Sequence, residues 1–229
     1  MSHVVLIPGA GGAGWYWSRV VPLLEAAGHT AVALDLPADD DAAGLPEYVE
    51  LAHAACAYAE DVVLVGQSLG GFTAVMTAAH LVRSGRPPRA LVLLNAMVPA
   101  PGETPGAWWG NVDSESERKA AAAAGGWPDD PYDLDAYFLH DVDPVVAAEG
   151  EEFQREEVEA VFVSPCAIDA WPDVPTRVLA GADDRFFPLS LQRRVARDRL
   201  GIDVQVVPGG HLAALSQPEA VTAAILDSA

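Results

Sequence analysis

Short apolar runs alternate with longer amphipathic segments at both ends of the chain. The short runs, rich in β-branched residues, are typical of buried strands, and the longer segments have helical spacing of apolar positions. The pattern predicts strands at residues 3–7, 30–34, 61–65, 90–94, 176–180 and 203–207. It predicts helices at residues 15–27, 46–60, 72–84, 189–200 and 218–226. Such alternation predicts an α/β fold with a mostly parallel sheet of about six strands, flanked by helices on both faces.

The alternation is interrupted between residues 98 and 173, where no strong buried-strand run occurs. This stretch contains turns rich in proline and glycine, several tryptophans, and two helical patches at about 114–124 and 145–161. We therefore predict a core formed by residues 1–98 and 174–229. Residues 99–173 are predicted to be a mainly helical segment inserted into that core, called the insert below.

The charge of the chain limits its partners. There are 33 acidic residues against 13 Lys and Arg, giving a net charge of −20. Nucleic acids and anionic membrane surfaces require positive patches, so we exclude both as partners. No apolar run approaches membrane-spanning length and no leader-like segment precedes the first strand, so we expect a cytoplasmic protein. The sequence leaves open whether it is a monomer or homodimer. Cys56 and Cys166 have no zinc-ligand or C-x-x-C partner, and we expect neither a metal nor an organic cofactor.

One strand-to-helix junction carries the motif Gly66-x-Ser68-x-Gly70, directly after the buried run 62–65. A tight, strained turn at this point would push the serine Oγ clear of the sheet. The flanking glycines would remove the Cβ atoms that otherwise clash. The N-terminus of the following helix would direct free N–H groups toward the serine. The context therefore favours a nucleophilic Ser68 over a turn that uses glycine only for packing.

A serine hydroxyl is an effective nucleophile only when a base accepts its proton and a carboxylate holds that base in the right tautomer. Of the six histidines, only His211 follows a predicted strand on a glycine-rich loop. Asp183 and Asp184 follow the strand before it, and the residues alone do not decide between the two. Parallel α/β sheets gather their chemistry at the carboxyl ends of the strands, which predicts that these side chains meet Ser68.

The glycine-rich loop after the first strand allows two interpretations. In the first, an N–H of the loop joins the N–H of Leu69 to bind the negative charge that develops on an attacked carbonyl oxygen. In the second, the spacing Gly9-x-Gly11-x-x-Gly14 belongs to a dinucleotide-binding loop. The second interpretation leaves the serine, aspartate and histidine unexplained, so we favour the first.

With these motifs in this order, the chain resembles proteins of the α/β-hydrolase fold over nearly its whole length. It is most similar to small bacterial members related to plant methylesterases and hydroxynitrile lyases, which open with sequences like Val-Leu-Ile-Pro-Gly-Ala-Gly before a Trp-rich helix start. The resemblance implies that the insert is a cap over the site. It also implies Ser68 as nucleophile, His211 as base, Asp184 as acid, and Ala10 and Leu69 as oxyanion donors. Asp184 is preferred because Gly181, Asp184 and Pro188 match the family pattern Gly-x-x-Asp-x-x-x-Pro.

Two departures from the family pattern affect the prediction. The family usually has His-Gly after the first strand, where this chain has Pro8-Gly9, so the loop can differ while it keeps the Ala10 N–H. The antiparallel hairpin that opens larger members is missing, so the sheet is expected to be essentially all parallel.

We therefore expect a serine hydrolase that cleaves a small apolar carboxylic ester. The candidate pocket residues are Trp15, Met97, Trp108 and His140. One alternative is a lyase like the cyanohydrin-cleaving relatives, which need a cation to hold cyanide; Lys119, the only lysine, lies in a polar patch of the insert and makes this unfavourable. The other alternative is a non-catalytic small-molecule binder on the same fold.

Overall fold

The computed structural model describes residues 1–57 and 59–228. Within these residues, one six-stranded sheet has the order β2-β1-β3-β4-β5-β6, and every neighbouring pair is parallel. The predicted α/β fold with a parallel sheet is thereby confirmed. The strands are β1 (His3–Ile7), β2 (Thr30–Ala33), β3 (Val62–Gln67), β4 (Ala90–Leu94), β5 (Thr176–Gly181) and β6 (Gln205–Val207).

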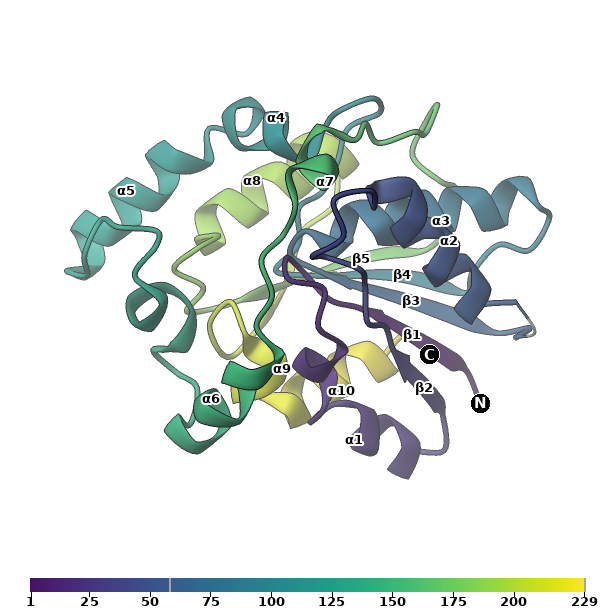
Figure 1. The fold of residues 1–229 in the computed structure, drawn as a ribbon, viewed down its shortest axis with the longest axis horizontal. Coiled ribbons are helices and arrows are strands. Elements are labelled where there is room, and N and C mark those ends of the chain that lie inside the picture. The colour runs from purple at the N-terminus through teal and green to yellow at the C-terminus, as the bar shows by residue number, and fades with distance from the viewer. Residues whose placement is uncertain (58, 229) are drawn as a thin grey trace.

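Helices cover both faces of the sheet (Figure 1). Successive strand residues point to opposite faces, so Val5 and Ile7 of β1 belong to one apolar cluster while Val4 and Leu6 belong to the other. The first cluster is completed by α2 (Leu45–Ala55), α3 (Gly70–Arg83) and α8 (Leu189–Leu200). The second is completed by α1 (Val21–Ala26), α9 (Ala213–Ser216) and α10 (Pro218–Leu226).

The insert, drawn in teal to green in Figure 1, lies over the end of the sheet where the strands finish. Residues 99–173 are all described, and they form helices and connecting segments without a strand. Among these helices, α4 contacts α5 and α7, and α5 contacts α8 of the core. The helices are α4 (Pro105–Asn111), α5 (Ser114–Gly125), the π-helical turn η2 (Asp135–Leu139), α6 (Pro144–Gly150), the 3-10 turn η3 (Glu151–Phe153) and α7 (Glu159–Val163).

Two predicted helices are divided in the structure. The helix expected over residues 145–161 becomes α6, η3 and α7, with an extended segment at 154–158 between η3 and α7. In that segment the Val158 N–H donates to the Ala38 carbonyl of the core at 2.9 Å, so a contact with the core replaces a helical hydrogen bond. The helix expected over residues 15–27 becomes the 3-10 turn η1 (Gly14–Trp17) followed by α1.

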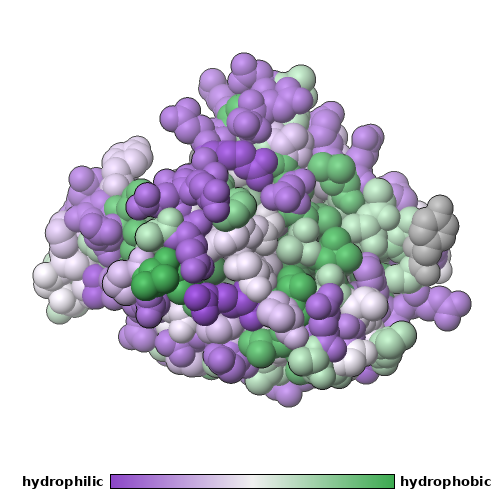
Figure 2. Space-filling view, turned by 60° about the horizontal axis from the view of Figure 1, so that its bottom comes forward, coloured by the Kyte–Doolittle hydropathy of each residue, from purple (hydrophilic) through white to green (hydrophobic). Residues whose placement is uncertain are grey.

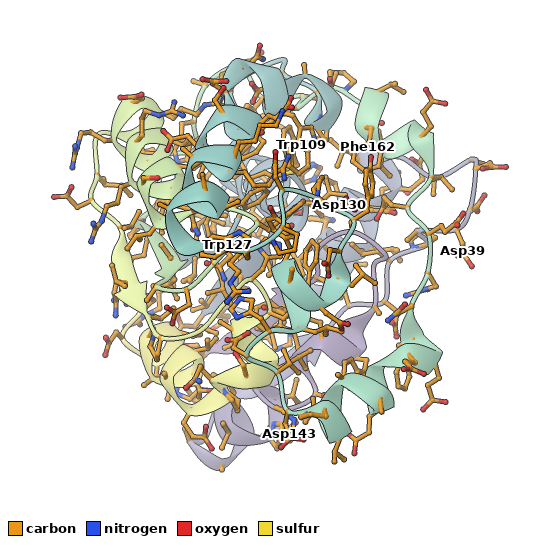
Figure 3. The ribbon with its side chains drawn as sticks, turned by 90° about the vertical axis from the view of Figure 1, so that its left-hand side faces the viewer. Asp39, Trp109, Trp127, Asp130, Asp143 and Phe162 are labelled. Atoms are coloured by element: carbon orange, nitrogen blue, oxygen red, sulfur yellow. The ribbon has the colours of Figure 1, made fainter. Side chains whose placement is uncertain are left out.

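Acidic side chains are exposed on several parts of the surface. Asp39, Asp130 and Asp143, labelled in Figure 3, are all exposed, and they come from a core loop and two parts of the insert. On the face shown in Figure 2, apolar residues form small patches interspersed with polar ones. None of the described helices is both long and apolar enough to span a bilayer.

Candidate active site

Ser68 occupies a strained turn between the end of β3 and the start of α3. Its φ is +50°, a left-handed conformation that is uncommon for a residue with a side chain. The flanking glycines are required by close packing: a Cβ on Gly66 would lie 2.6 Å from the Gly70 carbonyl oxygen, and one on Gly70 would lie 2.3 Å from the Pro8 carbonyl oxygen. The turn can therefore form because glycine occupies the two positions, 66 and 70, at which a Cβ would clash with a backbone carbonyl oxygen.

His211 connects Ser68 to a buried carboxylate. Its Nε2 lies 3.1 Å from Ser68 Oγ, and its Nδ1 lies 2.9 Å from Asp184 Oδ2. His211 follows β6 and Asp184 follows β5, so both come from the carboxyl ends of neighbouring strands. With the proton on Nδ1, His211 donates to the carboxylate and leaves Nε2 free to accept the Ser68 proton.

The Asp184 carboxylate is buried but fully hydrogen-bonded. Oδ1 accepts the N–H groups of Phe186 at 2.9 Å and Phe187 at 2.8 Å, while Oδ2 accepts the Gln192 amide at 3.2 Å in addition to His211. Asp183, by contrast, is exposed, and among the described residues its side chain takes no part in this hydrogen-bond network. The structure thus brings Asp184, and not its neighbour, to His211.

Asn95, which sequence reasoning did not single out, ties the loops of this site together. It follows β4, has φ +45° and is completely buried. Its Oδ1 accepts the Gly181 N–H at 2.6 Å, and its Nδ2 donates to the carbonyls of Gly210 at 2.9 Å and His211 at 3.2 Å. One feature of the sequence does point to Asn95: it is a polar residue directly after a fully apolar strand. A buried amide in such a place must find hydrogen-bond partners inside the protein.

The backbone N–H groups of Ala10 and Leu69 are available for a ligand, since neither donates a hydrogen bond within residues 1–57 and 59–228. The loop that carries Ala10 touches the serine: a Cβ on Gly9 would lie 2.8 Å from the Ser68 Cβ. Ala10 is exposed to the pocket described below, and Leu69 begins the turn into α3.

The same loop is poorly suited to a dinucleotide. The Gly11 N–H donates to the Glu157 carboxylate at 2.8 Å, and the Gly14 N–H donates to Asp35 at 2.9 Å. In a phosphate-binding loop these N–H groups would face the ligand oxygens. Carboxylates already take these positions, and their negative charge would repel a pyrophosphate.

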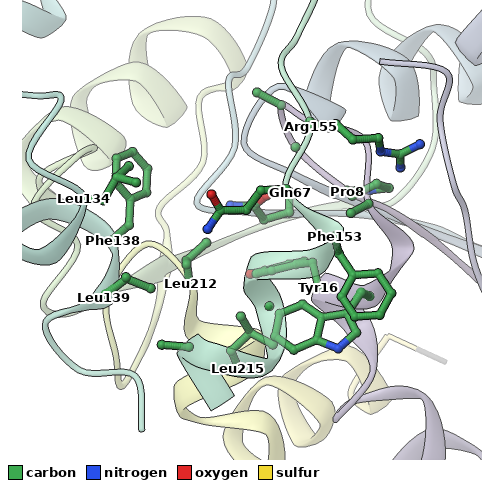
Figure 4. Close-up of a pocket in the computed structure, with 18 residues that line it drawn as sticks. Pro8, Tyr16, Gln67, Leu134, Phe138, Leu139, Phe153, Arg155, Leu212 and Leu215 are labelled. Carbon is green, nitrogen blue, oxygen red and sulfur yellow. The ribbon is translucent and has the colours of Figure 1, made fainter. Parts of the chain in front are cut away.

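A pocket of about 290 Å³ lies beside the loop (Figure 4). Its wall combines the core residues Trp15 and Leu212 with Phe138 and Phe153 of the insert. Trp15 and Phe153 stack with ring centroids 5.4 Å apart and planes inclined by 10°, which joins core and insert at one side of the pocket. The other lining residues are Pro8, Gly9, Ala10, Gly11, Ala13, Tyr16, Gln67, Leu134, Leu139, Ala147, Gly150, Gln154, Arg155 and Leu215.

Three residues expected in the pocket lie elsewhere. Met97 is 1% exposed in the core, and Trp108 is 2% exposed with its indole N–H donating to the Val98 carbonyl at 3.1 Å. His140 lines a separate hollow next to Asp141, and burial lowers the pKa of its imidazole. Of the four pocket candidates, the structure therefore places only Trp15 on this pocket.

The polar residues near the pocket offer no obvious metal site. Within the described residues, no three His, Cys, Asp or Glu side chains come close enough together to hold an ion. The Arg155 guanidinium is directed to Asp35, with 3.4 Å between Nη2 and Oδ1. Lys119 lies on α5, half exposed and paired with Glu115 at 2.5 Å. The lining of the pocket is thus predominantly apolar, with the guanidinium of Arg155 as a charged group that contacts Asp35.

This fold and site define a hydrolase-type α/β protein, and comparison with known sequences agrees. Residues 4–224 match the alpha/beta hydrolase family, and the chain belongs to that family. The probable esterase PIR7A of Oryza sativa subsp. indica is 40% identical over 111 residues, which cover 44% of this chain and 41% of the rice protein. A pyrethroid hydrolase of Sphingobium wenxiniae is 27% identical over a stretch covering 100% of this chain and 88% of that protein. The matched stretch thus spans less than half of the rice relative.

Solved structures share the fold over the whole chain. The crystal structure of polyneuridine aldehyde esterase superposes with a TM-score of 0.79 at 22% identity, covering 99% of this chain and 98% of the esterase. A methylesterase from Arabidopsis gives a TM-score of 0.77 at 18% identity, covering 100% and 98% of the two chains. At these identities the likeness establishes the architecture.

Proposed function

We propose that this protein is a carboxylic ester hydrolase in which Ser68, His211 and Asp184 act as a catalytic triad. The observation that carries the proposal is the continuous hydrogen-bonded chain from Ser68 Oγ through both nitrogens of His211 to Asp184 Oδ2. Membership in the alpha/beta hydrolase family and relatives named as esterases support the same reaction.

In the proposed mechanism Ser68 Oγ attacks the ester carbonyl carbon while His211 Nε2 accepts the hydroxyl proton. Asp184 holds the Nδ1–H and stabilises the imidazolium that forms. The negative charge moves to the carbonyl oxygen, where the N–H groups of Ala10 and Leu69 donate to it. Collapse of this intermediate breaks the ester C–O bond, and His211 gives its proton to the departing alcohol. A water molecule, deprotonated by His211, then cleaves the acyl-enzyme and releases the acid.

The pocket favours neutral, apolar esters. Its walls are built mainly from aromatic and aliphatic side chains, and the guanidinium of Arg155 is already paired with Asp35. The net charge of −20 would repel an anionic substrate at longer range. The volume of about 290 Å³ suits a small ligand.

The reaction is tested with short-chain methyl and ethyl esters, by titrating the acid released. Wild type is expected to hydrolyse at least one of them, and Ser68→Ala should lose at least roughly 10³-fold in kcat. Ser84→Ala is the matched control, because Ser84 is an exposed serine at the end of α3, and it should retain full activity. Equal rates for Ser68→Ala and wild type would overturn the proposed mechanism.

In the lyase alternative, Ser68, His211 and Asp184 act as acid and base, and a positively charged side chain is needed to hold the cyanide that is released. The lysine of the chain is paired with Glu115 on the exposed face of α5, outside the pocket. Measuring cyanide release from mandelonitrile separates the two reactions: the hydrolase proposal expects none, and appreciable release would replace it with the lyase. A binder would show neither reaction.

A further inference from the structure

Tyr16 places a polar group in the wall of an otherwise apolar pocket. It belongs to η1, is 7% exposed, and its ring packs edge-on against Trp17 with centroids 4.8 Å apart. The residue lines the pocket, and Figure 4 shows its hydroxyl directed toward the Leu212 side, away from Phe153. The packing of its ring therefore holds the phenol in place in a residue that borders the pocket.

The hydroxyl of Tyr16 uses only part of its hydrogen-bonding capacity. Its oxygen accepts the Ala214 N–H at 3.4 Å. Its own proton finds no acceptor among residues 1–57 and 59–228. Burial raises the pKa of the phenol, so the oxygen keeps its proton and remains a donor at ordinary pH. A buried donor without a partner costs free energy that a ligand acceptor can recover.

Two other polar side chains of the wall, Gln67 and Arg155, already donate hydrogen bonds within the protein. The Gln67 amide donates to the His211 carbonyl at 3.3 Å, and Arg155 donates to Asp35 at 3.4 Å. The scissile carbonyl oxygen has its own proposed donors in the N–H groups of Ala10 and Leu69. The proton of Tyr16 is thus left for a different oxygen of the bound molecule.

We propose that Tyr16 determines specificity by donating a hydrogen bond to a second oxygen of the substrate, so that the preferred substrate is an apolar ester that also carries an ether, hydroxyl or carbonyl acceptor. This inference rests on the proposed esterase function of the same pocket. It narrows the substrate class from any small apolar ester to one with an acceptor at a fixed distance from the scissile bond.

The test uses pairs of methyl esters in which one chain CH2 beyond the α-carbon is replaced by an ether oxygen, with the position of the oxygen varied. Wild type, Tyr16→Phe and the control Tyr132→Phe are compared on every pair by kcat/KM. Tyr132 is an exposed tyrosine of the insert, at 88% exposure, so its variant should behave as wild type. Comparing the two enzymes on the same ester cancels intrinsic differences in ester reactivity.

For at least one position of the oxygen, Tyr16→Phe is expected to lose roughly tenfold in kcat/KM on the ether ester while changing little on its carbon isostere. Equal losses on both members of every pair, or no loss on any, would overturn the inference while leaving the esterase function intact. Failure of wild type to hydrolyse any ester would instead overturn the proposed function, and the inference with it. If Tyr16→Phe does not fold, wild type alone is used: kcat/KM on each ether ester is divided by kcat/KM on its carbon isostere. A ratio that does not vary with the position of the oxygen would overturn the inference.

Discussion

Glu157 of the insert accepts the N–H of Gly11, in the loop beside Ser68, at 2.8 Å. Its other carboxylate oxygen accepts the Tyr48 hydroxyl at 2.5 Å, so one side chain of the insert holds both the glycine-rich loop and α2 of the core. The insert therefore contacts the core through this side chain as well as lining the pocket. Glu157 holds the loop segment next to Ala10, one of the two proposed oxyanion donors.

This contact predicts a pH dependence of stability. Burial raises the pKa of Glu157, although the hydrogen bonds from Tyr48 and Gly11 oppose the shift. The folded protein therefore binds the Glu157 proton more tightly than the unfolded chain does. The resulting contribution to stability is full below the ordinary glutamate pKa and is lost as the pH rises through the raised value.

Glu157→Gln removes this titration while leaving an amide in the same place. Urea unfolding between pH 4 and 8 should show wild type losing stability relative to the variant as the pH rises through the raised pKa, at roughly constant m-value. Glu156→Gln is the neighbouring control, because Glu156 is exposed. The free energy of unfolding of wild type minus that of Glu157→Gln should fall with pH. A difference that stays constant, or that grows with pH, would contradict this account.

The carboxylate assignment is tested by a pair of adjacent substitutions. Asp184→Asn should reduce kcat by about 10²- to 10⁴-fold, because an amide no longer holds His211 in the tautomer that accepts the Ser68 proton. Asp183→Asn should change kcat less than about threefold, since Asp183 is exposed and surface substitutions are mostly neutral. Steady-state kinetics on a hydrolysed ester decides, and a larger loss at Asp183 would reverse the assignment.

Asn95 should be important for stability. Asn95→Ala leaves the Gly181 N–H and the Gly210 carbonyl without their partner, and it puts alanine, which tolerates the left-handed region less well than asparagine, at φ +45°. We expect a loss of about 2–4 kcal/mol in the free energy of unfolding. Asn95→Gly removes the same hydrogen bonds without the backbone strain, and should be less destabilised by about 1 kcal/mol. Identical stabilities for the two variants would show that the left-handed backbone contributes nothing.

Close packing at the serine gives a further prediction. A Cβ at Gly9 would lie 2.5 Å from Gln67 Oε1 and 2.8 Å from the Ser68 Cβ, so Gly9→Ala must displace the nucleophile or the loop. We expect kcat/KM to fall at least roughly tenfold, since small misplacements of reacting groups are costly. Gly110→Ala is the control, because nothing lies within 4 Å of its Cβ position. Unchanged kcat/KM in Gly9→Ala would contradict the close approach.

Much of this arrangement could be predicted from sequence because the signals are local. The apolar runs specify the six strands, and glycine spacing specifies the turn at Ser68. The position of His211 after β6 follows from the same alternation. Asp184 required the family pattern, because two adjacent aspartates are equivalent until their backbone directions are known.

Other features depend on tertiary contacts that no local pattern encodes. The extended segment 154–158 exists because Val158 and Glu157 bond to the core, and this overrides its helical pattern. Trp108 and Met97 were expected in the pocket, yet apolar character does not distinguish a wall residue from a core residue. Asn95 was missed because its four-way contact joins loops far apart in sequence.

The central claim is that Ser68 is an activated nucleophile, and intact mass after treatment with a fluorophosphonate tests it most directly. The account predicts one adduct on wild type, none on Ser68→Ala, and one on the exposed-serine control Ser84→Ala. An equally labelled Ser68→Ala variant, or a folded wild type that takes up no reagent, would contradict it.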